Sequence, residues 1–580
     1  MNDKNMQLFG NGLKRTYGTE ARRYNLLAAR LIADLVKGFL GPRGLEKMFI
    51  DILGEMTVTK DGATFLRKID VEHPAAKVII EAANAVDNAV GDGTTSVVVL
   101  AGALVEKAEG LLEIGVSPSR ILDGYHNAMH MALEIVRKVS IETTNHDKEI
   151  MRYLVDTCLR SKAVSHFTEE ILIPSLVVQG ICEIADFSRR HLEVDDIKIE
   201  EKIGNSSDTE LVHGTVIDKT IDDSSMPRII ENAKILLLDS DIQDERTKTD
   251  AEIRISDSSQ MTAFIKKKNS NLLQKIQYVI ESGANVIFSR GGIDSLALNH
   301  FAKNKMLTVR RVKENDLLWL AKATGAKIVR DLDSINGSDL GYAAKVYEKT
   351  VGDDKMVFVD GCRNPKSITF LLRANSKKIL DEFHRTILDS IYVLRNFITD
   401  PKIVPGGGAV EAFIAMLIKE RSYQLPGKEQ IVIQKFAEAL EEIPLTIARN
   451  SGLNTVDIRA HLRQRVYSQS QPKNSKKSKD NFNNDREWYG INALERKIDN
   501  MMEMHVIEPL IVKEQILITA TEVIILLMRV DDVLMKKPVE THGHSHTHMD
   551  GTTHSHKGGS KPHDHFDKLG KQQRPMHHYY

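Results

Sequence analysis

Cysteine is scarce in this 580-residue chain, and its placement argues against two classes of protein. The three cysteines are Cys158, Cys182 and Cys362, and none of them has the Cys-x-x-Cys spacing of a zinc or redox site. So few cysteines cannot build the disulfide framework that is typical of small secreted domains. The composition therefore favours a protein of a reducing compartment.

Long apolar runs and an excess of one charge are absent as well. The run nearest to a membrane span, 516–530, is interrupted by Thr519, Glu522 and Arg529, whereas a span needs about 20 apolar residues. The first residues lack the basic-then-apolar order of a signal peptide. The formal net charge is −1, which gives no general attraction to nucleic acid or acidic lipid. We expect a cytoplasmic protein with no nucleic-acid and no membrane partner.

Three common catalytic signatures are missing from the sequence. It contains no Gly-x4-Gly-Lys-Ser/Thr phosphate loop, and no Gly-x-Gly-x-x-Gly motif after a strand. No Ser/His/Asp or Cys/His nucleophile arrangement stands out either. These absences argue against a standard P-loop ATPase and against a dinucleotide-dependent enzyme.

The chain is long enough for about two to four domains, and its pattern changes twice along its length. Apolar residues recur at helical spacing in 20–40, 73–140 and 147–186, and again from about 373 to 529. Between these parts, 233–329 alternates short apolar runs with helical segments. This order predicts an α/β domain around a mainly parallel sheet, inserted between helical segments from both ends of the chain.

Two further segments have a composition that is typical of unstructured chain. Residues 468–485 are rich in Ser, Lys and Asn, and residues from about 540 to 580 are rich in Gly, Ser, Thr and His. Too few apolar side chains are present in either segment to offset the entropy of ordering.

The most informative motif is Gly91-Asp92-Gly93-Thr94-Thr95-Ser96, which opens an apolar helix. Glycines let the backbone approach a phosphate closely, and the start of a helix favours an anion. Asp92 is placed to hold a Mg²⁺ ion between phosphate oxygens. Taken alone, the motif is equally typical of a tight turn followed by a capped helix.

Three other short segments add to this motif, although each has a simple structural explanation. Leu40–Gly44 can be a plain helix stop, Thr59–Gly62 a β-turn and Pro405–Ala409 a flexible linker. Two further carboxylates, Asp61 and Asp389, complete with Asp92 the set that phosphoryl transfer to water requires.

Taken together, the motifs resemble those of one known family, the group II chaperonins, over about residues 15–535. The segments 41–44, 60–62, 91–96 and 405–408 have the order and spacing of that family. Further segments are most similar to the gamma subfamily of the eukaryotic cytosolic chaperonin CCT/TRiC: 71–77, 400–408, 439–444, 488–492 and 508–513.

The resemblance implies a multi-domain α/β and α architecture, the chaperonin fold. A mainly helical equatorial ATPase domain would comprise 1–150 and 401–539, and 468–485 would be a disordered loop within it. A hinge-like intermediate domain would comprise 151–225 and 368–400. An apical α/β substrate-binding domain with a helical protrusion would comprise 226–367, and 540–580 would be a disordered His-rich tail.

The resemblance also implies roles for individual residues in binding ATP and Mg²⁺. Asp92 would hold Mg²⁺, Asp61 and Asp389 would orient the attacking water, and Lys162 would sense the γ-phosphate. The residues implied in nucleotide binding are Leu40, Gly41, Pro42, Gly62, Gly93, Thr94, Thr95, Ser96, Gly407, Gly408, Gly490 and Glu508. Arg373-Ala374-Asn375 departs from the usual Arg-Gly-Ala of the family, so Ala374 must have ordinary backbone angles.

The function implied is ATP hydrolysis by one subunit of a hetero-oligomeric double ring, which encloses and folds client proteins. The partners would be paralogous subunits and unfolded clients such as cytoskeletal proteins. One alternative is a ring subunit that binds ATP but scarcely hydrolyses it. Another is metal buffering by the alternating histidines of 542–548, which can ligate Zn²⁺, Ni²⁺ or Cu²⁺; a hydrophilic tail without specific function also fits.

Two surfaces are expected to meet partners. The hairpin at 47–59 and the strand-like 529–534 would leave open sheet edges in a monomer, and in the family such strands pair between neighbouring subunits. On the apical helix at 315–324, one side should pack on the sheet and the other should face clients. The packed side is Leu320, Ala321 and Thr324, and the client side is Leu318, Trp319 and Lys322. Burial of Trp319 against a neighbouring helix is the alternative.

Overall fold

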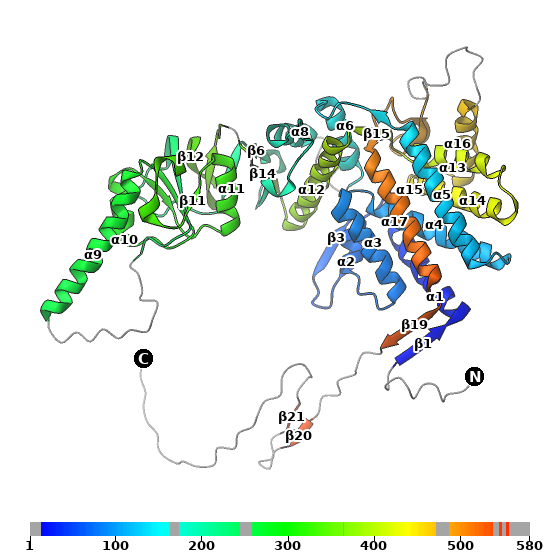
Figure 1. Cartoon of the computed structure of the whole chain (residues 1–580), viewed down its shortest axis with the longest axis horizontal. Helices are drawn as coiled ribbons and strands as arrows, with labels where there is room; N and C mark the ends of the chain where they lie inside the picture. The colour runs from blue at the N-terminus through cyan, green and yellow to red at the C-terminus, as the bar shows by residue number, and fades with distance from the viewer. Residues whose placement is uncertain are drawn as a thin grey trace. The chain divides into compact units, whose positions relative to one another are not determined.

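The computed structural model describes residues 13–162, 173–243, 258–363, 365–470, 486–536, 545–547 and 553–555 (Figure 1). Contacts divide the chain into two compact units, one made from its two ends and the other spanning Arg23–Arg529. Much of the Ser/Lys/Asn-rich segment at 468–485 and most of the His-rich tail lie outside the described residues. Only 468–470 of the former are described, at the end of α16 (Thr455–Ser470).

The unit made from the chain ends is built on a two-stranded ribbon. Strand β1 (Leu13–Tyr17) pairs antiparallel with β19 (Asp532–Lys536), so that Thr16 lies opposite Val533. The strand predicted at 529–534 therefore begins later than expected. In the tail, β20 (Ser545–Thr547) pairs with β21 (Thr553–Ser555), so the expectation of no secondary structure does not hold at these two short strands.

In the larger unit, helices from both sides of the inserted segment share one hydrophobic core. Buried residues from Leu26 to Val139 pack with residues from Val404 to Met528. The helices are α1 (Gly18–Val36), α2 (Gly62–Lys68), α3 (Pro74–Val90), α4 (Thr94–Glu113), α5 (Pro118–Val139), α13 (Ala409–Ser422), α14 (Gly427–Leu440), α15 (Glu442–Asn450), α16 and α17 (Leu510–Arg529), with the short 3-10 helix η2 (Lys37–Phe39).

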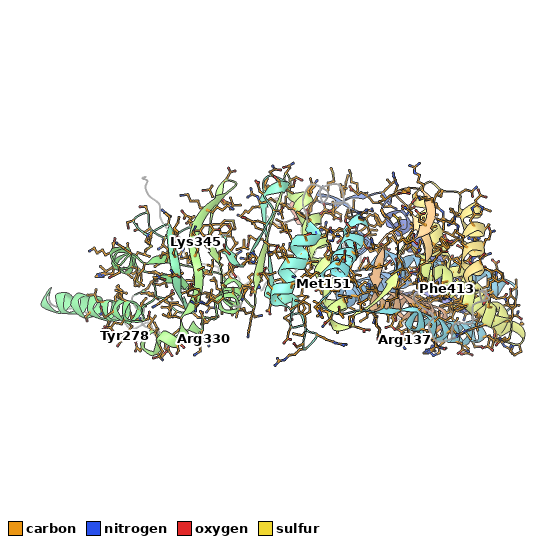
Figure 2. All side chains as sticks on the ribbon, turned by 90° about the horizontal axis from the view of Figure 1, so that it is seen from above. Arg137, Met151, Tyr278, Arg330, Lys345 and Phe413 are labelled. Carbon is orange, nitrogen blue, oxygen red and sulfur yellow. The ribbon has the colours of Figure 1, made fainter. Side chains whose placement is uncertain are left out.

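Aromatic contacts stabilise this core, and one of them joins its two halves. The Tyr125 ring on α5 packs edge-on against Phe436 on α14, with centroids 5.6 Å apart, and its hydroxyl donates to the Leu104 carbonyl. Phe413, labelled in Figure 2, packs in the same way against Trp488. The Tyr125–Phe436 contact joins segments that are about three hundred residues apart in sequence. The Phe413–Trp488 contact lies within the later segment.

Short strands interrupt the helices that were expected to run to Arg529. Strand β15 (Lys402–Pro405) lies between β4 (Ile141–Glu142) and β18 (Ile507–Pro509), and β16 (Tyr489–Asn492) forms a hairpin with β17 (Lys497–Asn500). The predicted N-terminal hairpin is confirmed as β2 (Lys47–Ile50) and β3 (Met56–Thr59).

A second core joins Met151–Ile197 to Ile368–Ile403. Its helices are α6 (Lys148–Arg160), α8 (Ile173–Ile184) and α12 (Lys377–Thr399), of which α6 and α12 lie side by side (Figure 1). Strand β14 (Ile368–Ala374) pairs parallel with β5 (Ile197–Ile203) and antiparallel with β6 (Glu210–Val212). Ala374 ends β14 opposite Ile203, in ordinary extended backbone.

A third core contains the seven-stranded sheet of the inserted segment, and its order corrects one prediction. Strands β8 (Ile229–Leu238), β9 (Val286–Ser289), β10 (Leu307–Val309) and β11 (Ile328–Val329) are parallel, as expected. Strands β12 (Gly341–Val351), β13 (Asp354–Asp360) and β7 (Gly214–Ile217) are antiparallel. The sheet is therefore mixed rather than mainly parallel, because the turn at Gly352 folds β12 and β13 into a hairpin.

The helices of this segment are α9 (Ser258–Glu281), α10 (Ser295–Lys303) and α11 (Glu314–Thr324). Short 3-10 helices complete the chain at η3 (Val194–Asp196), η4 (Ser206–Asp208), η5 (Leu332–Ser334) and η6 (Gly337–Asp339). The first core corresponds to the expected equatorial segments, the second to the intermediate segments and the third to the apical segment. The domain boundaries stay a prediction.

Helix α11 corrects the expectation of a free client-facing side. Leu320 and Thr324 are buried, as predicted, and Leu318 is exposed. However, the Trp319 indole donates to the Asp195 carbonyl at 2.9 Å, and Lys322 forms an ion pair with Asp196. Trp319 is therefore half-buried against η3, close to the alternative that was expected for it, whereas Lys322 stays exposed beside Asp196. Client contact at this helix stays a prediction.

Among the described residues, no helix combines the length and the apolar content that crossing a membrane would require.

We predict that Phe436→Ala lowers the free energy of unfolding by about 3 to 5 kcal/mol, because it leaves a cavity beside Tyr125. Urea unfolding of the full chain measures this change. The control is Tyr423→Ala on the exposed surface after α13, with an expected change under about 0.5 kcal/mol. Equal effects of the two variants would contradict the shared core.

Candidate functional site

A cavity lies between segments from distant parts of the chain. Its walls come from the ends of η2 and α6, the starts of α4, α13 and α17, and the β16–β17 hairpin. Of the residues predicted from the sequence, those lining it are Leu40, Gly41, Pro42, Asp61, Asp92, Gly93, Thr94, Thr95, Ser96, Lys162, Gly407, Gly408 and Glu508.

The glycine turn before α4 has the geometry that its sequence predicts. Gly91 and Gly93 have φ angles of 72° and 85°, which disfavour any side chain. A Cβ atom on Gly91 would lie 2.3 Å from Tyr392, so glycine is also required by space. Gly93 caps α4 without a side-chain hydrogen bond. The N–H groups of the first turn of α4 are therefore available to an anion.

Two predicted residues stand behind this wall of the cavity. A Cβ atom on Gly62 would lie 2.7 Å from the Thr95 hydroxyl, so the turn after β3 contacts the start of α4. Asp389, on α12, is not a lining residue, but its carboxylate pairs with Lys162, which lines the cavity. The Asn396 side chain donates to the Val90 carbonyl at 2.8 Å, which holds α12 against the end of α3.

Lys162 lies among the acidic residues of the site. Its Nζ atom lies 2.8 Å from Asp389 Oδ2 and 4.0 Å from Asp92 Oδ1. Burial lowers the pKa of Lys162, but the charges of Asp389, Asp92 and Asp61 together outweigh burial and hold the pKa well above its usual range. Lys162 therefore stays charged.

The two predicted catalytic carboxyls have pKa values shifted in opposite directions. Burial raises the pKa of Asp389 to about 8, against the opposing effect of Lys162. Burial also acts to raise the pKa of Asp61, but Lys162, two hydrogen bonds from Thr64 and Arg385 hold that pKa below its usual range. One carboxylate is therefore ionised at neutral pH, and the other has a proton affinity that suits a base.

The opposite wall of the cavity is formed by backbone and apolar side chains. Gly407 and Gly408 have φ angles of 61° and 77°. A Cβ atom on Gly408 would lie 2.5 Å from Pro444. Gly490 stands behind this wall, because its Cβ atom would lie 2.9 Å from the Gly407 carbonyl oxygen. A flat ring can approach such a surface closely.

An ion-paired lysine fixes Glu508 on the same side. Lys513 Nζ lies 2.8 Å from Glu508 and 2.7 Å from Glu411, and both Lys513 and Glu411 are buried. Burial lowers the pKa of Lys513, but the two carboxylates outweigh this effect and raise it. Glu508 is therefore held in place before any ligand arrives.

Sequence reasoning missed several lining residues, among them Lys60, Ile447, Asn492, Met501 and Lys513. Charged residues inside the otherwise apolar faces of α13 and α17 could have indicated Glu411 and Lys513. No sequence signal indicates the apolar walls, because they depend on contacts between distant helices.

The residues present fit a nucleotide polyphosphate with Mg²⁺. The site offers a helix N-terminus, hydroxyls of Thr94 and Thr95, and a charged lysine for phosphate, with one carboxylate, Asp92, for the metal. Within the described part of the chain, no group of three or more His, Cys, Asp or Glu could hold a metal unaided, so phosphate oxygens would have to complete the coordination. The alternating histidines at 542–548 lie mostly outside the described residues.

Comparison with known proteins defines the class of this chain. A model of the TCP-1/cpn60 chaperonin family matches residues 32–538. Thermosome subunit alpha of Archaeoglobus fulgidus is 42% identical over 532 residues, which cover 91% of this chain and 94% of the relative. Thermosome subunit alpha of Aeropyrum pernix is 42% identical over 528 residues, covering 90% of this chain and 92% of the relative.

A thermosome subunit of Methanopyrus kandleri is 40% identical over 526 residues, covering 90% and 93% of the two chains. The chain therefore belongs to the TCP-1/cpn60 chaperonin family, and the predicted multi-domain chaperonin fold is confirmed. Its similarity to thermosome subunits assigns it to group II of that family.

We predict that Asp389 in the ligand-free protein titrates with a pKa of about 8. The carboxyl is neutral below that pH and ionises above it, because burial penalises the charged form. Infrared difference spectra between about pH 6 and about pH 10 should show the loss of a protonated-carboxyl band. The band should be missing in Asp389→Asn, and a midpoint near that of an exposed aspartate would contradict the burial.

Proposed function

We propose that this chain is an ATP-hydrolysing subunit of a hetero-oligomeric, double-ring, cytoplasmic chaperonin of the gamma type found in CCT/TRiC. One observation carries the proposal: six separate segments converge at one cavity with the groups that phosphoryl transfer needs. They are the Gly91–Ser96 turn, Asp61, the Lys162–Asp389 pair, the Gly407–Gly408 backbone and Glu508.

The residues would divide the chemistry as follows. Bound Mg²⁺ would supply neutralising charge to the phosphate oxygens, and Asp92 would hold it. The N–H groups at the start of α4 would donate to the β- and γ-phosphates, and Lys162 would hold the terminal phosphate. Asp61, already ionised, would orient the water, and the ionised form of Asp389, which the charge of Lys162 favours, would accept its proton.

The same contacts suggest how nucleotide would move other parts of the chain. Lys162 follows α6, while Asp389 lies on α12, which continues from β14. A phosphate that draws Lys162 away from its carboxylates would change the contacts at the end of α6. Rotation of this segment would then drive ring closure over a client, which the resemblance suggests includes cytoskeletal proteins.

We predict that Asp389→Ala binds ATP within about threefold of the wild type but loses turnover by about 100-fold or more. The reason is that this carboxylate acts on the water in the transition state rather than on the bound nucleotide. Phosphate release should be measured in an assembled ring whose other subunits cannot hydrolyse ATP. Near-normal release would exclude Asp389 as the base.

The same assay distinguishes the alternative of a ring subunit that binds ATP but scarcely hydrolyses it. In that case, the wild-type subunit would bind ATP and release almost no phosphate. The complete carboxylate set favours the hydrolysing subunit.

Exposed apolar surface supports assembly with other subunits. At the tip of the β2–β3 hairpin, Ile52 and Leu53 are 101% and 92% exposed. On α1, Tyr24, Leu27 and Leu31 are also exposed, at the spacing of one helix face. Apolar patches of this kind mark interaction sites, and an open hairpin edge can pair with a neighbour's strand. Paralogous subunits are the partners that the resemblance implies.

We predict that Ile52→Asp combined with Leu53→Asp weakens ring assembly by about tenfold or more, because a buried unpaired charge is costly. Native mass spectrometry with the partner subunits measures the ring population. The control is Val456→Asp, an exposed apolar position on α16, which should assemble normally. Unchanged assembly of the hairpin variant would show that the tip is not an interface.

A further inference from the structure

Two hydrogen bonds in series lead from α12 to the backbone of Asp61. The Thr59 hydroxyl donates to Glu382 Oε2 at 3.0 Å, and the same hydroxyl oxygen accepts from the Asp61 N–H at 3.0 Å. Thr59 ends β3, Asp61 caps the start of α2, and Glu382 lies in the second turn of α12. A hydroxyl has one hydrogen to donate and lone pairs that accept, so both bonds form at once.

The network is buried, so it holds its members firmly. Thr59, Asp61 and Glu382 are all buried. Arg385 Nη2 donates to the same Glu382 oxygen at 2.6 Å, and its charge compensates the buried carboxylate. Without the Thr59 hydroxyl, both the carboxylate and the Asp61 N–H would lose this partner. A buried polar group that loses its partner is costly, because water does not replace it.

The place of Glu382 on α12 relates this network to the other candidate catalytic carboxyl. Glu382 and Asp389 are seven residues apart, about two helical turns, and therefore lie on one face of α12. Between them, the Thr386 hydroxyl donates to the Glu382 carbonyl at 2.8 Å. One helix thus carries Asp389 and, through Thr59, also holds the turn that carries Asp61.

We infer that Glu382 is a positioning residue for hydrolysis, which sets the separation between Asp61 and Asp389 through the Thr59 hydroxyl. This inference rests on the proposed function. Asp61 lines the cavity, whereas Thr59 and Glu382 lie behind it and would not touch the nucleotide. Their effect would be on the geometry of the attacking water, since a displacement of about 1 Å can lower a rate by about 100-fold.

A purely structural role for this network makes a different prediction. Strand β3 belongs to the hairpin whose tip is exposed. If Glu382 only anchored that hairpin, loss of the link would weaken ring assembly, or would disturb nucleotide binding and turnover together. A positioning role would instead lower turnover and leave affinity and assembly nearly unchanged. The comparison of turnover with affinity therefore separates the two explanations.

The experiment measures phosphate release in an assembled ring whose other subunits cannot hydrolyse ATP, and binding of a non-hydrolysable ATP analogue to the full-length chain. Thr59→Val removes the hydroxyl and keeps the shape of the side chain. We expect turnover to fall by about tenfold or more and affinity to change by less than about threefold. Thr59→Ser keeps the hydroxyl and should retain turnover within about twofold. The control is Thr57→Val, a half-buried position on the same strand, which should leave both quantities unchanged.

Substitutions of Glu382 test the same link from its other end. Glu382→Gln keeps an oxygen that can accept from Thr59, so it should lose less turnover than Glu382→Ala. Thr59→Val combined with Glu382→Ala should lose no more turnover than the weaker of the two single variants, because both remove one link.

Normal turnover in Thr59→Val, an equal loss in Thr59→Ser, or parallel loss of turnover and affinity would overturn the role of Glu382. Each of these results would leave the proposed function intact, because the wild-type ring would still hydrolyse ATP. Absence of phosphate release from the wild-type ring would overturn both. If Thr59→Val does not assemble, Glu382→Ala compared with Glu382→Gln provides the same test.

Discussion

The ion pair between Lys162 and Asp389 is the contact on which the site depends. It joins the end of α6 to α12, and Asp92 of the glycine turn lies within reach of the same ammonium group. Asp61 and Asp389 are both buried, and their charges would be costly without a cation nearby. The pair therefore positions the candidate base, leaves Asp61 ionised and brings together segments that are more than two hundred residues apart.

The second constraint is the lack of room for a side chain at two turns, where only glycine fits. The turn at Gly91 leaves no room for a Cβ atom beside Tyr392, and Gly408 leaves none beside Pro444. Both residues have positive φ angles as well, so conformation and packing require the same residue. Backbone at these two turns therefore lies at the cavity, together with side chains such as those of Ile447 and Met501. Such walls can contact phosphate on one side and a flat ring on the other.

Local chemistry made much of this site predictable. The glycine turn and the N-terminal hairpin could be predicted because neighbouring residues determine them. The resemblance to a known family supplied the residues that come from further along the chain. Burial was not predictable, because Asp389 taken alone has the sequence context of a solvated helix residue.

The predictions that were wrong or incomplete share one physical origin, because they also depend on contacts between distant segments. The alternation of strands and helices over 233–329 was predicted, but β12 and β13 were not. Strand β12 pairs antiparallel with both β8 and β13 and makes the sheet mixed, because pairing partners are not encoded in hydrophobic period alone. Trp319 was assigned to an open surface because its position on the helix was considered without its neighbours. Its indole in fact reaches a carbonyl in η3, more than a hundred residues earlier.

The most direct test of the account is calorimetric titration of a non-hydrolysable ATP analogue into the full-length chain, with Mg²⁺ and then with a chelator. The account predicts one site per chain, with affinity that falls by about tenfold or more when Mg²⁺ is removed or when Asp92 is changed to Ala. Absence of binding, or binding that depends on neither Mg²⁺ nor Asp92, would contradict it.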